Sequence, residues 1–295
     1  MVRESFEERL NDFRARVETA LGALVPEAGE QPETLHSAMR HSLEAGGKRL
    51  RPVLVCATAE CFGGPADPLP AAAAIECLHT YTLIHDDLPA MDDSDLRRGR
   101  PTCHRVYGEA AAVLAGDALL TLAFGIIARS YPGDPDLAVR IAAELAEASG
   151  SRWLVGGQME DLENEGAGID AATLSAINEK KTGALIAAAC VMGARIGGAA
   201  EGQVGVVRDF GFALGGAFQV IDDILDSTAP ADQTGKPGGL DEENGKTTFV
   251  SLEGLEKARD RADGLTRRAA GLLRDVEGDT SFLSDLLDWL NRRKA

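Results

Sequence analysis

The sequence predicts an all-α protein, and three observations lead to that fold class. Apolar residues recur three and four positions apart over long stretches; residues 4–24 show this helical spacing at Phe6, Leu10, Phe13, Val17, Leu21 and Leu24. Alanine is abundant, and no run of alternating β-branched residues indicates a strand. Segments rich in glycine and proline fall where helices should end, at residues 62–70, 131–135 and 229–239.

The same spacing predicts further helices in order, over residues 52–62, 70–87, 105–130, 135–164, 170–197, 201–227, 248–275 and 280–294. No domain linker, internal repeat or low-complexity tract interrupts this pattern. We therefore expect residues 1–295 to form a single domain of long helices, which alanine and glycine allow to pack closely.

Charge and composition exclude several classes of partner. The formal net charge is −17 at pH 7. Nucleic acids and anionic membrane surfaces are bound by surplus Lys and Arg, so neither is an expected partner. No apolar run reaches the ~18 residues that a membrane span needs, and no signal-like segment opens the chain. Five cysteines, an odd number without a CxxC pair, indicate reduced thiols and a cytoplasmic protein.

Two stretches place adjacent aspartates at the end of an apolar helix. Residues 86–87 form one pair, with Asp92 after it, and residues 222–223 form the other, with Asp226 one turn later. Positions four apart share a helix face, so Asp222 and Asp226 should point the same way. A single pair of this kind is more often a solvated helix end. Two pairs, each among Leu, Ile and Val, favour a ligand site.

These carboxylates predict a cation. Two unit charges about 4 Å apart repel by ~4 kcal/mol at an effective dielectric constant of roughly 20, so facing aspartates need positive charge between them. Oxygen ligands without a Cys or His cluster favour Mg²⁺, which takes one or two carboxylates and fills its other positions with water and phosphate. The aspartates therefore predict a phosphorylated ligand bound through magnesium.

Cations gather beside glycines in this acidic chain. The stretch GGKRLRP, residues 46–52, combines glycines, cations and a proline that can begin a helix, and this combination favours an anion. It lacks the spacing of a Walker loop, and by itself a solvated loop is an equal alternative. Further cations follow at Arg97, Arg98, Lys180, Lys181, Lys236 and Lys246. Their number predicts two anionic groups.

Five stretches together form a family pattern by their order and spacing: GGKRLRP, LIHDDLPAMDDSDLRRGRPTCH, GGQMEDL, KTGALI and FQVIDDILD. In this pattern the chain resembles the trans-prenyl diphosphate synthases, most closely the bacterial-type farnesyl diphosphate synthases, from about residue 35 onward. The resemblance implies the isoprenoid synthase fold, a bundle of roughly ten or more long helices around a central cavity. One departure is TTFV at residues 247–250, where the family often has Thr-Thr-Tyr-Pro.

The resemblance implies a prenyltransferase that condenses isopentenyl diphosphate, head to tail, with dimethylallyl or geranyl diphosphate. Ionising an allylic C–O bond needs stabilisation of the leaving group's charge, and no side-chain nucleophile. The family likeness further implies roughly three magnesium ions and a homodimer. The implied metal ligands are Asp86, Asp92, Asp222 and Asp226, while Asp87 and Asp223 would assist by hydrogen bonding.

The resemblance also divides the cations between two substrates. Isopentenyl diphosphate would be bound by Gly47, Lys48, Arg51, His79 and Arg98. The allylic diphosphate would be bound by Arg97, Lys181 and Lys236, with Lys246 closing over it. Thr182 and Gln219 would lie near the reacting carbons, so the expected catalytic group is Lys181, Thr182 and Gln219. Gln158 is a weaker candidate, with packing as the alternative.

Product length should depend on side chains beneath Asp86 on its helix. One helical turn rises ~5.4 Å, roughly one isoprene unit. Geometry alone selects Thr82 and Leu78 as the floor, whereas the resemblance selects Tyr81, with the small Thr82 beside it. An ordinary core position for Tyr81 is the alternative. We expect farnesyl diphosphate (C15) as the main product and keep geranylgeranyl diphosphate (C20) as the alternative.

Two other classes of protein are weighed against this interpretation. A class I terpene cyclase also combines an aspartate-rich helix, magnesium and an all-α fold, but it needs no second diphosphate site. GGKRLRP and the second aspartate motif therefore argue against it. A non-catalytic subunit of a prenyl synthase is the other class; such subunits usually lose one aspartate motif, and this chain keeps both.

Overall fold

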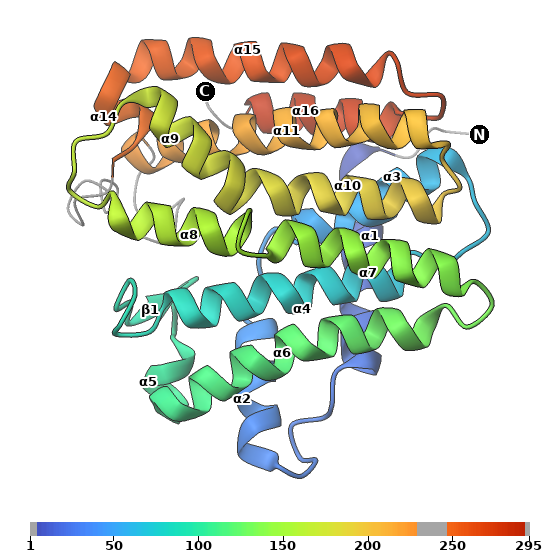
Figure 1. The fold of residues 1–295 in the computed structure, drawn as a ribbon, viewed down its shortest axis with the longest axis vertical. Helices are drawn as coiled ribbons and strands as arrows, with labels where there is room; N and C mark the ends of the chain where they lie inside the picture. The colour runs from blue at the N-terminus through green and yellow to red at the C-terminus, as the bar shows by residue number, and fades with distance from the viewer. Residues whose placement is uncertain (1–4, 229–246, 293–295) are drawn as a thin grey trace. The chain divides into compact units, whose positions relative to one another are not determined.

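The fold is almost entirely helical, which confirms the all-α prediction (Figure 1). The computed structural model describes residues 5–228 and 247–292. Its Cα atoms group into two compact units. Unit 1 comprises residues 1–56 and 67–142, and unit 2 comprises residues 57–66 and 143–295. The expectation of a single domain stays a prediction.

Unit 1 contains the elements of the first half of the chain. In order they are α1 (Phe6–Leu24), α2 (Glu33–Leu43), the start of α3 (Leu50–Phe62), α4 (Leu69–Asp86), β1 (Leu96–Arg97), β2 (Arg100–Pro101), α5 (Cys103–Tyr107), α6 (Glu109–Ser130) and the start of α7 (Pro135–Ser149).

Unit 2 contains the ends of α3 and α7 and all later elements. These are α8 (Leu154–Glu163), α9 (Ala171–Asn178), the π-helix η1 (Glu179–Gly183), α10 (Ala184–Ile196), α11 (Glu201–Thr228), α14 (Phe249–Glu253), α15 (Leu255–Leu273) and α16 (Ser281–Arg292).

α4 is the central helix of unit 1. Proline in its first turn lacks an N–H that would be unpaired there, so it favours a helix start. The helix is apolar nearly all round, from Ala71 to Ile84, as expected of a helix that is covered on every side. It packs mainly against α6 and also against α1 and α2. The core of unit 1 therefore holds the helix whose end carries the first aspartates.

Unit 2 is built around α10 and α11, which lie side by side, with α15 along α11 (Figure 1). α10 is buried along nearly its whole length. Glycines bring the helices close: a Cβ on Gly211 would lie 2.5 Å from Ala187 Cα, and one on Gly215 would lie 2.8 Å from Gly183 Cα. The small residues noted in the sequence therefore serve close packing.

Several helix boundaries differ from the sequence expectation, each for a local reason. The expected helices 105–130 and 248–275 are each divided by a glycine with positive φ, Gly108 (84°) and Gly254 (83°). A glycine in this region of φ ends a helix at little steric cost. The expected helix 135–164 is interrupted at residues 150–153, and α2 was not predicted.

A two-stranded hairpin also interrupts the helical pattern, between α4 and α5. β1 and β2 are antiparallel, with Leu96 opposite Pro101 and Arg97 opposite Arg100. The two turn residues, Arg98 (φ 55°) and Gly99 (φ 73°), both have positive φ, as a tight primed turn requires. Strands this short leave no alternating pattern for sequence analysis to detect.

Two helices, α6 and α11, are long and apolar enough to cross a membrane by length and composition. This test uses the mean hydropathy of a window, so it does not contradict the expectation that no uninterrupted apolar run reaches such a length. The apolar window of α6 is 39% buried and that of α11 is 56% buried. Core helices of water-soluble proteins also pass such a test, so length and composition do not decide between the two environments.

Candidate active site

The described candidate residues fall into two groups, one in each unit. Unit 1 holds Gly47, Lys48, Arg51, His79, Tyr81, Thr82, Asp86, Asp92, Arg97 and Arg98, and unit 2 holds Lys181, Thr182, Gln219, Asp222 and Asp226. Lys236 and Lys246 lie outside the described residues.

The first aspartate segment, residues 86–95, folds back onto the end of α4. The N–H of Asp92 donates to the carbonyl oxygen of Asp86 (2.8 Å), and the N–H of Ser94 donates to that of Asp87 (3.2 Å). Asp86 and Asp92 are only partly buried. Carbonyl groups at the helix end thus hold the segment, and the carboxylates of Asp86 and Asp92 remain partly exposed.

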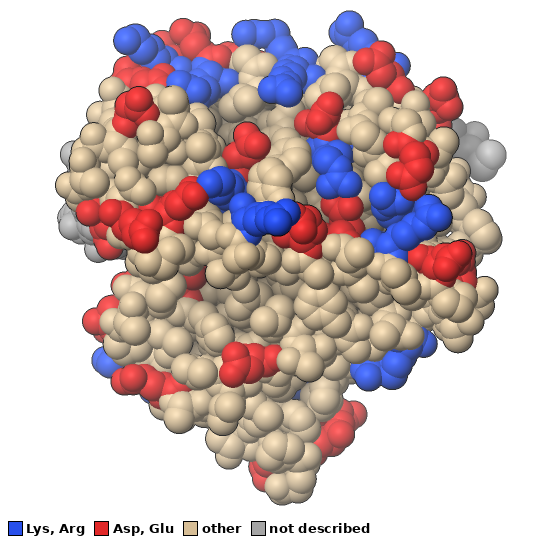
Figure 2. Space-filling model, viewed as in Figure 1, with Lys and Arg blue, Asp and Glu red and all other residues tan. Residues whose placement is uncertain are grey.

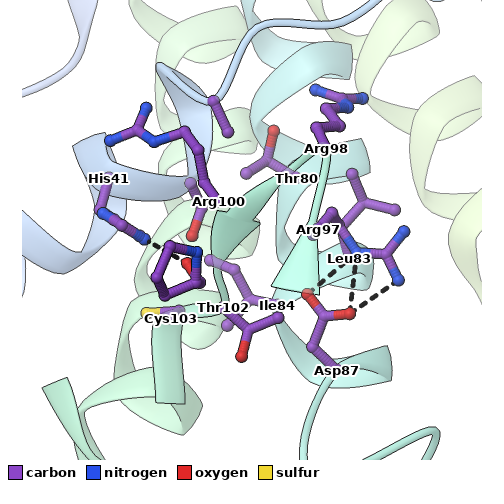
Figure 3. Close-up of a pocket in the computed structure, with 13 residues that line it drawn as sticks. His41, Thr80, Leu83, Ile84, Asp87, Arg97, Arg98, Arg100, Thr102 and Cys103 are labelled. Atoms are coloured by element: carbon purple, nitrogen blue, oxygen red, sulfur yellow. Dashed lines mark hydrogen bonds and ion pairs between the residues drawn. The ribbon is translucent and has the colours of Figure 1, made fainter. Parts of the chain in front are cut away.

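Asp87 is more deeply buried than Asp86 and Asp92, and Arg97 binds its carboxylate. Arg97 Nε donates to both of its carboxylate oxygens, at 2.8 and 2.9 Å, and Nη2 lies 2.7 Å from Oδ1 (Figure 3). Burial raises the pKa of Asp87 above its ordinary value, although the Arg97 charge opposes this. Burial alone would lower the pKa of Arg97, but Asp87, Asp86 and Asp92 outweigh it and raise that pKa. The pair fixes the hairpin to α4.

Basic residues surround His79 on α4. Its Nε2 lies 3.2 Å from Nη1 of Arg51. Burial, followed by the positive charges of Arg51, Arg98, Arg97 and Arg49, holds the pKa of His79 well below its ordinary value. The imidazole is therefore neutral at pH 7, and its Nε2 accepts the hydrogen bond from Arg51. A site with this much positive charge favours a multiply charged anion.

The GGKRLRP loop approaches the hairpin closely. Arg98 donates to the carbonyl oxygen of Gly46, and a Cβ on Gly47 would lie 2.7 Å from Arg98 Nη2. Gly47 also has a φ of 127°, which L side chains rarely adopt. Arg97, Arg98 and Arg100 of the hairpin line a small cavity of about 20 Å³ beside His41 and Thr80 (Figure 3). Glycine at 47 thus admits the Arg98 guanidinium.

Arg49 anchors the same loop from beneath. Its Nη1 lies 2.6 Å from Glu76 on α4, its Nε 2.7 Å from Glu18 on α1, and Nη2 donates to Leu43 O at the end of α2. The Arg49 and Glu76 side chains are 2% and 3% exposed. Arg49 is therefore unavailable to a substrate, but it sets the position of Lys48 and Arg51 on either side of it.

In unit 2, the π-helix η1 presents two lysines to α8. Lys181 Nζ lies 2.6 Å from Asp161, and Lys180 pairs with Glu160. A π-helical turn is wider than an α-helical one and is frequent at functional sites. α8 and η1 pack closely at this point, because a Cβ on Gly157 would lie 2.5 Å from the backbone nitrogen of Lys181. Gly157 of GGQMEDL therefore brings the acidic residues of this stretch within reach of η1.

A chain of hydrogen bonds links η1 to α11 and α14. Thr182 Oγ1 donates to Gln219 Oε1 (3.2 Å), and Gln219 Nε2 donates to Asp223 Oδ1 (3.1 Å). The N–H of Phe249, the first residue of α14, donates to Asp223 Oδ2 (3.0 Å). Asp223 is 5% exposed. This chain joins Thr182 and Gln219, the two residues expected near the reacting carbons.

Asp222 and Asp226 lie on the same helix as Asp223, α11, but are more exposed than it is. Both are partly buried, whereas Asp223 and Ile224 are buried. Their spacing of one turn places both carboxylates on one face, as the sequence predicted. On α8, the buried Nε2 of Gln158 makes no hydrogen bond within the described residues. A buried amide without a partner is rare, and the Gln158 side chain is an exception within the described residues.

The candidate floor residues differ in environment. Tyr81 is 7% exposed, and its ring packs against that of His85. Thr82 is partly buried, and its hydroxyl donates to the carbonyl oxygen of His79 within α4 (2.7 Å). Leu78 is fully buried. Burial raises the pKa of Tyr81, and the Asp86 charge adds to this, so the phenol stays neutral.

Sequence analysis did not identify four of the residues that organise this site. Arg49 and Glu76 form the buried pair beneath the loop, and Glu160 and Asp161 bind the lysines of η1. A signal existed for two of them, since acidic residues in GGQMEDL oppose the lysines of KKTG in charge. Nothing comparable marked Glu76, which is one acidic residue in an apolar helix.

Comparisons with known proteins agree with this architecture. A model of the polyprenyl synthetase family matches residues 32–276. The farnesyl diphosphate synthase of Geobacillus stearothermophilus is 42% identical over 296 residues, with 99% of each chain covered. The chloroplastic geranylgeranyl pyrophosphate synthase 7 of Arabidopsis thaliana is 48% identical, with 88% of this chain and 76% of the relative covered.

A solved structure is similar over the same length. The geranyltransferase of Helicobacter pylori, crystallised with magnesium and isoprenyl diphosphate, matches with a TM-score of 0.83 at 32% identity. The match covers 99% of this chain and 98% of that one. The chain thus combines a helical fold with carboxylates at two helix ends and arginines gathered around His79. The chain belongs to the polyprenyl synthetase family and is a prenyltransferase that elongates prenyl chains.

Arg49→Ala should lower the free energy of unfolding by about 3–5 kcal/mol, because it leaves Glu76 buried without a cation. Denaturant unfolding measures this change. As a control, Arg259→Ala removes an exposed pair with Glu256 and should cost less than about 1 kcal/mol. Equally small effects of the two substitutions would show that the buried pair does not anchor the loop.

Proposed function

We propose that this prenyltransferase is a magnesium-dependent farnesyl diphosphate synthase that joins isopentenyl diphosphate to dimethylallyl or geranyl diphosphate and acts in the cytoplasm. One observation carries the proposal: the basic residues around His79 and the first aspartate segment meet at one residue of unit 1, Arg97. The negative charges of Asp86 and Asp92 raise the pKa of Arg97. Arg97 is also one of the arginines whose positive charge lowers the pKa of His79. A cation site and an anion site so close together suit a metal diphosphate beside a second anion.

The proposed binding roles follow the two groups of residues. Isopentenyl diphosphate is bound by the cluster around His79, with Gly47, Lys48, Arg51, His79 and Arg98 as its ligands. The allylic diphosphate is bound by Arg97, Lys181 and Lys236, and Lys246 closes over it. In the structure Arg97 and Lys181 each pair with a carboxylate, which orients the cation before substrate binds.

Magnesium fits the donor set that the chain offers. Asp86, Asp92, Asp222 and Asp226 are partly buried oxygen donors. Among the residues that the structure describes, no three His, Cys, Asp or Glu side chains are grouped so as to hold a metal ion. Carboxylate oxygens suit Mg²⁺, which uses one or two carboxylates and completes its coordination with water and phosphate. We propose these four aspartates as the ligands of roughly three ions that supply Lewis-acid stabilisation of the departing diphosphate.

The chain's own groups act on charge and orientation. Arg97 and Lys181 neutralise the diphosphate as the allylic C–O bond breaks. The hydroxyl of Thr182 and the amide oxygen of Gln219, which are hydrogen-bonded to each other, stabilise the carbocation. Isopentenyl diphosphate attacks through its double bond, and the released diphosphate takes the final proton. No side chain needs to serve as nucleophile or base.

We propose Tyr81 as the floor that stops elongation at C15. Support comes from its burial on the helix that carries Asp86, and from the 42% identical farnesyl diphosphate synthase. The similar geranylgeranyl pyrophosphate synthase keeps C20 as the alternative product. A floor needs a large rigid side chain, which Tyr81 supplies and Thr82 does not.

We also propose a homodimer formed through α6. Val113 and Leu114 on this helix are 40% and 58% exposed, although they are large and apolar. The surface over α6 is mostly uncharged, with isolated acidic side chains (Figure 2). An open groove of about 620 Å³ runs between α2 and α6, with Leu35, Met39 and Leu122 in its lining. An exposed apolar patch of this kind typically marks a protein interface.

The purified chain should consume isopentenyl diphosphate with an allylic primer and Mg²⁺, and EDTA should abolish this turnover. Asp86→Ala and Asp222→Ala should each lower kcat by at least ~10²-fold, the size expected for losing a major electrostatic element. Asp95→Ala is the matched control, because Asp95 is exposed and, among the described residues, its ion pair is with the exposed Arg105. Steady-state kinetics at saturating Mg²⁺ measures all three variants.

The same assay separates the alternative classes. A class I terpene cyclase would convert an allylic diphosphate without consuming isopentenyl diphosphate, and a non-catalytic subunit would convert neither. Either result for the wild-type chain would refute the proposed reaction. Near-normal turnover of Asp86→Ala or Asp222→Ala would refute the metal assignment alone.

Tyr81→Ala should shift the product from C15 toward C20 and longer chains, because it removes bulk beneath the site without removing a carboxylate. Chromatography of the dephosphorylated products measures the distribution. Thr82→Ala, which changes little volume one position along, is the matched control and should retain C15. A sharp, unchanged C15 peak from Tyr81→Ala would show that other side chains form the floor.

Leu114→Lys should convert a dimer into a monomer, because it places a charge in the apolar patch on α6. Light scattering should give the wild type twice the 31.1 kDa chain mass and the variant the single mass. Val155→Lys, at an exposed apolar position on α8, should leave the dimer intact. A monomeric wild type, or a dimeric Leu114→Lys variant, would contradict the proposed interface.

A further inference from the structure

The ring of Tyr81 is held in place by another ring. Tyr81 and His85, one turn apart on α4, meet edge to face, with their centroids 5.5 Å apart and their planes at 84°. Aromatic pairs favour this geometry. His85 is held in turn by α6, because its Nε2 lies 3.1 Å from the carbonyl oxygen of Val113. The position of the Tyr81 ring therefore depends on the position of His85.

The His85 ring occupies space that exists because residue 116 is glycine. A Cβ on Gly116 would lie 2.5 Å from His85 Cδ2 and closer still to Nε2, a separation that real Cβ atoms essentially never show. Gly116 is buried in the middle of α6, and its φ is not positive. Glycine is a poor helix former, so neither the helix nor a turn explains it here. The space that the His85 imidazole needs explains why residue 116 is glycine.

We propose that Gly116 and His85 are positioning residues that set the product length through Tyr81. This inference rests on the proposed function, in which Tyr81 forms the floor of the elongation site. Gly116 admits the His85 ring, the Val113 carbonyl fixes that ring, and the ring holds Tyr81 from the side. Product length is thereby controlled from α6, a helix that carries none of the proposed metal ligands or substrate-binding residues.

One methyl group added at residue 116 would occupy the space of the His85 ring. An alanine at 116 displaces the imidazole from its place against α6, so that Tyr81 loses its edge-to-face partner. The phenol ring is then free to leave the path of the growing chain. Tyr81 is still present but no longer blocks every growing chain. A fraction of the C15 product is therefore elongated once more.

The first test is the product ratio of Gly116→Ala. Loss of one aromatic contact should raise the C20 to C15 ratio roughly two- to tenfold. Gly125→Ala is the matched control: it makes the same exchange in the same helix, where a Cβ would meet only the flexible end of Arg129, at 3.1 Å. Its ratio should equal that of the wild type. An unchanged ratio in Gly116→Ala would overturn the inference.

The second test shows whether Gly116 acts through Tyr81. Gly116→Ala is made in a Tyr81→Ala background, where the proposed floor is already absent. The double variant should have the product distribution of Tyr81→Ala alone. A further shift in the double variant, as large as that in the wild-type background, would show that residue 116 acts independently of Tyr81 and would overturn the proposed relay.

The third test needs no turnover, so it separates this inference from the proposed function. The chain has three tyrosines, so NMR of ring-labelled tyrosine can be assigned with Tyr81→Phe. Gly116→Ala should move the Tyr81 ring signals and leave those of Tyr131 in place. Unmoved Tyr81 signals would overturn the inference even if the chain proves inactive, while an inactive wild type would refute only the proposed function.

His85→Ala covers the case in which Gly116→Ala fails to fold. It removes the imidazole without adding volume, so it should also move the Tyr81 signals and raise the C20 to C15 ratio. Because His85 precedes Asp86, the rate of this variant is not interpreted, and the product ratio is the readout. A C15 product with unmoved Tyr81 signals in His85→Ala would overturn the relay.

Discussion

A buried carboxylate needs a partner, and this requirement organises the candidate site. The acidic side chains that are buried in the described part of the chain are Glu76, Asp87 and Asp223. Each is satisfied by a group from another segment: the Arg49 guanidinium, the Arg97 guanidinium and the N–H of Phe249. Leaving one unpaired would cost several kcal/mol, on the order of a large share of a domain's stability. Each pair therefore ties a loop, a hairpin or a short helix to the core.

The same requirement distinguishes the two members of each aspartate pair. Asp87 and Asp223 are buried and bind Arg97 and the N–H of Phe249. Asp86 and Asp222 are only partly buried. Adjacent residues on a helix point about 100° apart, so one of each pair can face the core while the other faces a ligand. The buried member holds in place the segment that completes the site. A doubled aspartate thus places a structural carboxylate and a more exposed one next to each other at one helix end.

Close helix packing allows short polar side chains to meet. Gly211 and Gly215 let α11 approach α10 and η1, so that Thr182 reaches Gln219. In unit 1, Gly47 lets Arg98 lie against the loop. A methyl group at any of these glycines would collide with backbone or with a guanidinium, and interiors packed at crystal-like density absorb little of such a change. The polar contacts of the site are consequences of this packing.

The sequence by itself determined the helical class, the long helices and the residues of both aspartate motifs, because period, composition and motif spacing are local properties of the chain. It did not reveal α2 or the helix breaks at Gly108 and Gly254, because the same residues also occur within helices. Only the tertiary structure showed that Arg49 is buried against Glu76 and that Gly116 makes room for His85. These contacts join residues far apart in the sequence, and burial and separation in space are set by how helices pack, which no local pattern encodes.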